Sequence, residues 1–150
     1  MMKRLISIFF ALLLGTVLFA QEGLFVEELF EGRGIAPRQM KKTFISGAKL
    51  EPYRLDTYKS ITFQMREGLF HTVEVLVEQD AKSAVDKQVE YVNDHLTYAV
   101  ITLNPTYTGL NRYLCFQAKQ NNGIWDITLV YLRGTASVED LEKMFNKRKK

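Results

Sequence analysis

Few side chains in this 150-residue chain have the types and spacing that chemistry requires. The histidines are His71 and His95, and the single cysteine is Cys115. A bound Zn²⁺ needs three or four converging histidine, cysteine or carboxylate ligands. His71 and Glu74 are three residues apart and share a face of a predicted helix, but neither a His-Glu-x-x-His nor a Cys-x-x-Cys pattern occurs. The sequence therefore predicts no metal site and no cofactor.

Nucleophilic catalysis needs a serine or cysteine with an activating base within reach. No Gly-x-Ser-x-Gly pattern occurs, and Ser46 ends a predicted strand. The one dyad that can be drawn joins Cys115 to His95. If their strands pair, His95 lies opposite the region of Lys119, so the geometry counts against this dyad. A glycosidase needs two carboxylates across a cleft, and the 17 acidic residues single out no pair. The sequence assigns no catalytic residue.

The single cysteine excludes an intramolecular disulfide. Cys115 lies in a predicted strand between Leu114 and Phe116. A free thiol among apolar neighbours is usually buried. We therefore expect Cys115 to be buried and chemically unreactive.

The first twenty residues have the pattern of a secretory signal peptide. A basic start at 1–4 precedes the uncharged apolar run 5–19, and Ala20 stands before the polar Gln21. The run of about fifteen residues is shorter than the roughly twenty of a membrane-spanning helix. We expect cleavage after Ala20, a location in the periplasm or outside the cell, and no stable membrane anchor. A single domain at 21–146 and a basic tail at 147–150 would follow.

Charge argues against a nucleic-acid partner. The chain has 20 basic and 17 acidic side chains, but Lys3 and Arg4 lie in the predicted signal and four other basic residues form the tail. The predicted domain itself is thus slightly acidic. Nucleic-acid-binding domains usually carry a basic face, so we expect no nucleic-acid partner for this chain.

Hydrophobic periodicity predicts helices over 24–31, 68–82 and 138–146, and strands over 40–46, 58–65, 86–92, 95–103, 112–119 and 124–133. Residues 47–57 form a long predicted turn. Asn93-Asp94 favours a two-residue hairpin turn, and Ser137 with Asp140 resembles a capping box at the last helix. Consecutive strands on short turns make a meander. The predicted class is α+β, an antiparallel sheet of five to six strands with two to three packed helices.

Four stretches of the chain resemble a family of small exported Bacteroidetes proteins that form a domain of unknown function. They are 46–55 continuing through 58–61, 77–86, 129–134 and 141–145. Residues 18–21 are similar to the signal exits of that phylum. The resemblance covers nearly all of the predicted mature chain. It implies a compact exported domain and transfers no catalytic residue.

The two central strands are apolar on both faces. Trp125 belongs to the more continuous face, which we expect to be core, whereas Tyr113, Val130 and Leu132 lie on the other. A half-solvated antiparallel strand should alternate more cleanly. Either helices cover both faces, or the second face contacts a ligand, a protein or another copy of the chain. We take Tyr113, Val130 and Leu132 as the candidate binding residues, with Tyr113 exposed.

These observations leave the function unknown. The first hypothesis is an exported non-enzymatic domain that binds a protein or ligand through a sheet face or its loops. The alternative is a small periplasmic hydrolase with unidentified catalytic residues.

Overall fold

The computed structural model describes residues 24–32 and 39–148, with side chains as far as Lys143. The predicted signal peptide and the segment 33–38 lie outside these residues. The elements are α2 (Glu27–Phe30), β1 (Met40–Ser46), the 3₁₀ helix η2 (Ala48–Tyr53), β2 (Leu55–Arg66), α3 (Glu67–Lys82), β3 (Asp86–Val92), β4 (His95–Leu103), β5 (Asn111–Asn121), β6 (Ile124–Gly134) and α4 (Val138–Arg148).

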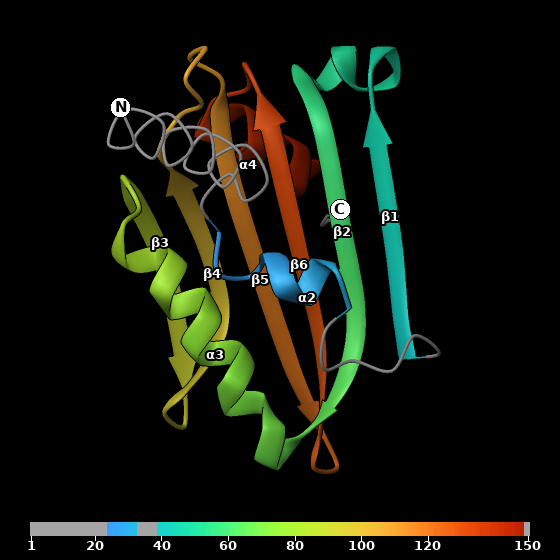
Figure 1. Ribbon diagram of the computed structural model, residues 1–150, viewed down its shortest axis with the longest axis vertical. Helices are drawn as coiled ribbons and strands as arrows, with labels where there is room; N and C mark the ends of the chain where they lie inside the picture. Colours follow the sequence, from blue (N-terminus) through green and yellow to red (C-terminus); the bar gives the residue numbers. More distant parts are fainter. Residues whose placement is uncertain (1–23, 33–38, 149–150) are drawn as a thin grey trace, which may run out of the picture.

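All six strands form one antiparallel sheet in the order β1-β2-β6-β5-β4-β3 (Figure 1). The strands from β3 to β6 follow one another as a meander, and β6 then pairs with β2. The predicted α+β class and the predicted strand number are therefore confirmed.

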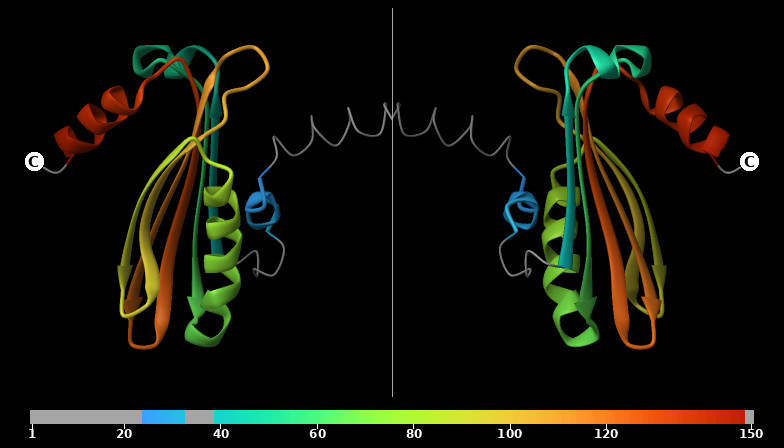
Figure 2. Two further views of the ribbon diagram at one scale, coloured as in Figure 1. Left: turned by 90° about the vertical axis from the view of Figure 1, so that its left-hand side faces the viewer. Right: turned by 90° about the vertical axis from the view of Figure 1, so that its right-hand side faces the viewer.

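Helices lie on both sides of this sheet (Figure 2). We call the side under α2 and α3 the core face and the opposite side, from which α4 projects, the second face. The apolar residues of α3 repeat at helical spacing, and Phe70, Val73 and Val77 are fully buried against the core face. This helix therefore fixes the main core.

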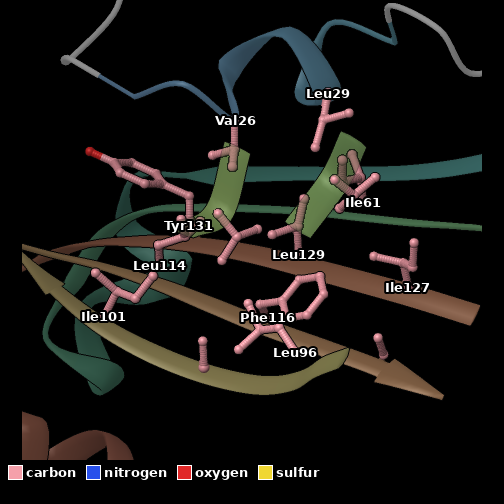
Figure 3. Packing of buried hydrophobic residues seen from close by; sticks show 14 of the residues in the cluster. Val26, Leu29, Ile61, Leu96, Ile101, Leu114, Phe116, Ile127, Leu129 and Tyr131 are labelled. Carbon is pink, nitrogen blue, oxygen red and sulfur yellow. The ribbon is translucent and has the colours of Figure 1, made fainter. Parts of the chain in front are cut away.

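The core face is a continuous apolar layer to which every element from α2 to β6 except β1, η2 and β3 contributes buried side chains (Figure 3). Leu129 of β6 pairs with Ile61 of β2 on one side and with Phe116 of β5 on the other. All three side chains are at most 1% exposed. Full burial of each such side chain contributes about 1.5–3 kcal/mol. Trp125 is also buried here, which confirms its predicted place in the core.

Two tight turns fix the register of the meander. Asn93 and Asp94 have φ of 52° and 66°, and Asn122 and Gly123 have φ of 53° and 77°. Positive φ at both central residues is the geometry of a type I′ hairpin, whose twist matches that of the strands. The predicted turn at Asn93-Asp94 is confirmed, and β3 and β4 have the predicted bounds.

The helix predicted at 24–31 has only four residues, Glu27–Phe30. Just before it, the buried Asp80 carboxylate of α3, 1% exposed, accepts hydrogen bonds from Phe25 N (2.7 Å) and Val26 N (3.0 Å). Val26 already has helical backbone angles (φ −71°, ψ −5°), so these bonds fix the start of α2 against α3, and Gly32, with a positive φ of 82°, follows its end. The periodicity of the sequence cannot predict these two contacts, because Asp80 lies 54 and 55 positions from its partners.

The predicted turn at 47–57 is also more regular than expected. It contains η2, and Arg54 then takes the left-handed conformation (φ 58°) before β2 begins at Leu55. At the far end of the chain, α4 extends to Arg148, beyond the predicted residue 146.

Candidate binding sites

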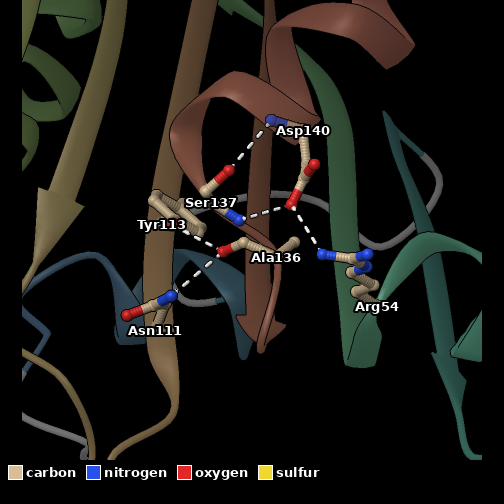
Figure 4. Close-up of polar contacts among 6 residues, drawn as sticks. All are labelled: Arg54, Asn111, Tyr113, Ala136, Ser137 and Asp140. Atoms are coloured by element: carbon tan, nitrogen blue, oxygen red, sulfur yellow. Dashed lines mark hydrogen bonds and ion pairs between the residues drawn. The ribbon is translucent and has the colours of Figure 1, made fainter.

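Tyr113 is a core residue of the second face, so the expectation of an exposed Tyr113 is wrong. It is 2% exposed, and its hydroxyl donates a 2.7 Å hydrogen bond to the carbonyl oxygen of Ala136. Asn111 Nδ2 donates to the same oxygen at 3.1 Å (Figure 4). The link between β6 and α4 thus closes over Tyr113.

The two other predicted binding residues share this cluster to different degrees. Leu132 is 3% exposed and Val130 is partly buried. They pack with Leu50, Leu55, Ala136 and Leu141. Leu50 of η2 and Leu141 of the first turn of α4 therefore cover Tyr113 and Leu132 at one end of the sheet. Val130 lies at the margin of the covered area.

Polar contacts fix the start of α4. Ser137 N donates to Asp140 Oδ2 at 3.0 Å, and Asp140 N donates to Ser137 Oγ at 3.1 Å. This reciprocal pair is the predicted capping box. Hydrogen bonds from Ser137, with the nearby charge of Arg54, lower the pKa of Asp140. A side chain at Gly134 would overlap the carbonyl group of Arg54, so the chain crosses η2 closely before the helix begins.

Beyond this first turn α4 diverges from the sheet (Figure 2). It leaves a strip of the second face uncovered, which we call the open strip: Tyr98, Val100, Cys115 and Val130. The last three are aligned across β4, β5 and β6 and are partly buried, and Tyr98 is 38% exposed. The strip is apolar at its centre.

Acidic side chains lie at one end of the open strip. Burial raises the pKa of Tyr98 above its usual value, and the charges of Glu90 and Glu142 add to the shift. Glu90 is the partner of Tyr98 on β3, and Glu142 belongs to α4. Both carboxylates are exposed.

Cys115 lies within this strip rather than in a catalytic arrangement. It stands opposite Val100 on β4, five residues from His95, so the structure does not form the Cys115–His95 dyad. The residue is only partly buried, where a buried cysteine was expected. Its apolar surroundings nevertheless raise its pKa to about 12, which keeps the sulfur protonated.

His95 takes part in a different polar pair, which the sequence did not reveal. Its Nδ1 lies 3.0 Å from Oε1 of Glu74 on α3, and Glu74 Oε2 accepts a 3.0 Å hydrogen bond from Leu96 N. Glu74 is 4% exposed. A carboxylate that bonds a histidine Nδ1 fixes the orientation and tautomer of the ring.

Aromatic rings surround the other side of His95. Its ring contacts Phe70 and Trp125 edge to face, with centroids 5.6 and 5.2 Å apart. A pocket of about 330 Å³ opens beside it and is lined by Val92, Asn93, His95, Thr97, Ala118, Gln120 and Trp125. Trp125 Nε1 is buried and has no hydrogen-bond partner among the described residues.

The other candidates for chemistry do not converge. His71 is exposed on α3, and among the side chains that the structure describes, no three metal-ligating groups cluster. No helix within residues 24–32 and 39–148 is long and apolar enough to cross a membrane.

Comparison with known proteins identifies a family. The model of a family described as "Family of unknown function (DUF6108)" matches residues 13–145. No curated protein and no solved structure matches the chain.

Proposed function

The chain belongs to the family of unknown function DUF6108, and from this premise we propose that it is an exported, non-enzymatic domain that binds a protein on the open strip. The observation that supports this proposal is the divergence of α4 from the sheet, which leaves Val100, Cys115 and Val130 partly exposed. An apolar strip with a polar border is the usual composition of an interaction surface. Of the three binding residues proposed from the sequence, Val130 makes the direct contact, while Tyr113 and Leu132 lie beside the strip on the same face and pack against it.

The charges beside the strip define the partner. Glu90 lies opposite Tyr98 on β3, and the charges of Glu90 and Glu142 both act on Tyr98, so a matching surface presents an apolar side chain next to basic ones. Opposite charges at the border of an interface increase the association rate and the specificity more than the affinity. We therefore expect binding to weaken as the salt concentration rises.

We further propose that the protein acts outside the cytoplasm, as a domain at residues 21–146 that follows a cleaved signal and ends in the basic tail. The support is the basic start, the apolar run and Ala20 before Gln21. The resemblance to exported Bacteroidetes proteins supports an origin in that phylum. Mass spectrometry of the protein from its natural host should find Gln21 at the N-terminus; retention of Met1 would contradict export by cleavage.

Site-specific crosslinking tests the binding surface. A photo-crosslinking amino acid at Val130, in the natural host, should yield one discrete adduct whose yield falls when Tyr98 is replaced by Ser. The matched control places the same amino acid at Lys119, which is exposed at the polar end of the second face beside Asp126. Equal adducts at both positions, or none at Val130, would refute the proposed surface. An adduct with twice the mass of the chain would show that the partner is a second copy of this chain and not a separate protein.

A further inference from the structure

We propose that the pocket between His95 and Trp125 binds a small, neutral, hydroxyl-rich molecule of the size of one sugar unit. This site is separate from the open strip, because its residues belong to the core face and to the β3–β4 turn. A negative result for one proposal therefore leaves the other unchanged.

The buried carboxylate prepares His95 for a ligand. In the neutral tautomer that donates Nδ1–H to Glu74 Oε1, Nε2 is an acceptor. Nε2 has no partner among the residues that the structure describes. The ring of His95 lines the pocket, and the His95 side chain is 34% exposed. A ligand hydroxyl can donate a hydrogen bond to this atom.

The orphan N–H of Trp125 supplies the opposite polarity. A buried polar group without a hydrogen-bond partner destabilises the folded state, and Trp125 Nε1 is in this state while the indole ring lines the pocket. A ligand oxygen that reaches Nε1 would remove the cost. The atom is covered in the present structure, so binding includes a shift of the side chains over it.

The remaining polar groups of the pocket select a neutral ligand. Asn93 and Gln120 carry amides that both donate and accept, the Thr97 hydroxyl can accept while it donates to Glu90 O at 3.3 Å, and no lysine, arginine or carboxylate lines the pocket. A bound carboxylate or phosphate would lack a charged partner apart from His95, and Glu74 lies directly behind His95. Hydroxyl groups match all of these atoms. The volume of about 330 Å³ lies at the lower end of the usual range of ligand pockets, roughly 300–1,000 Å³.

The chain contains a built-in reporter of this site, because Trp125 is its one tryptophan. The full-length protein would be titrated separately with glucose, galactose, mannose and N-acetylglucosamine, and with acetate as a charged probe. The readouts are the emission of Trp125 and the NMR signal of its indole N–H. We expect a saturable change with at least one of the sugars and none with acetate.

Matched variants identify the pocket. Gln120→Ala removes an exposed amide of the lining and should weaken sugar binding about tenfold, the loss of one good hydrogen bond. Gln117→Ala removes an amide that is also exposed, from the same strand but from the second face, and should leave binding unchanged. His95→Gln should weaken binding at least as much as Gln120→Ala, with His71→Gln as its control.

Circular dichroism checks that each variant is folded. The proposal is overturned if none of the four sugars gives a saturable signal, if acetate alone does, or if the Gln117 and Gln120 variants lose affinity equally.

Discussion

The indole ring of Trp125 lies parallel to the ring of Phe70, with centroids 4.0 Å apart and planes inclined by only 6°. Phe70 is in the first turn of α3 and Trp125 is the second residue of β6. The stack therefore joins the helix to the central strand beside the His95 pocket. Stacked aromatic pairs contribute about 0.5–1.5 kcal/mol beyond the burial of their area.

Replacement of this indole should be costly. We expect Trp125→Ala to lower the free energy of unfolding by about 3–5 kcal/mol, the usual range for a buried aromatic side chain. Urea unfolding followed by far-ultraviolet circular dichroism measures it, since the variant has no tryptophan. Its neighbour Ile124 is exposed, and Ile124→Ala should change stability by less than about 0.5 kcal/mol. Similar losses for both variants would place Trp125 outside the core.

The hydroxyl of Tyr113 should contribute to stability. Tyr113→Phe keeps the buried ring but removes the donor to Ala136, so we expect a loss of about 0.5–1.5 kcal/mol. Asn111 Nδ2 continues to satisfy the carbonyl, which places the expected loss toward the lower end. Tyr107→Phe is the control, because Tyr107 is fully exposed. No difference between these two variants in urea would show that the Tyr113–Ala136 bond adds nothing.

Asp80 should make stability depend on pH. Burial raises its pKa above the usual 3.8, against hydrogen bonds from Phe25 and Val26 that lower it. Because the folded pKa exceeds the unfolded pKa, folding favours the protonated carboxyl. The contribution of Asp80 is complete below the unfolded pKa and is lost as the pH rises through the folded pKa.

The variant Asp80→Asn isolates this contribution, because the other carboxylates cancel in the comparison. The free energy of unfolding of the natural chain minus that of Asp80→Asn should fall as the pH rises from acid to neutral. A difference that increases over this interval would mean that the two backbone hydrogen bonds outweigh burial.

Cys115 should react slowly with alkylating reagents. The thiolate is the reactive form, and a rise in pKa from 9.0 to about 12 lowers the thiolate fraction about a thousandfold at mildly alkaline pH. Iodoacetamide labelling of the folded protein should therefore be far slower than labelling in urea, as mass spectrometry would detect. Comparable rates in both conditions would contradict the assigned environment of the thiol.

The sheet was predictable because its signals are local. Asn93-Asp94 fixes a turn through the φ values that these residues tolerate, and the alternation around Trp125 distinguishes one face of β6 from the other. Ser137 and Asp140 likewise cap α4 within four residues. Such features need no knowledge of the rest of the chain.

The candidate sites were less predictable because they depend on how elements dock. The exposure of Tyr113 is decided by the chain turning over it at Ala136, and periodicity along β5 cannot show that a helix of few turns will reach this end of the sheet. The Glu74–His95 pair joins residues 21 positions apart on different elements. In the sequence, each of the two resembles an ordinary surface residue. To predict the pair, one would have to know that α3 packs beside the start of β4.

The place of β6 in the sheet has a consequence for synthesis and folding. This strand is the last of the six in sequence, yet it pairs with β2 on one side and β5 on the other. Ile61 and Leu129, which stand opposite each other, are separated by more than sixty residues. A nascent chain that ends before Ile124 therefore has a β1–β2 hairpin and a β3–β5 meander with no strand to join them. Closing so long a loop is slow compared with forming local hairpins, so we expect the pairing of β6 with β2 to form last, after the last strand has been synthesised.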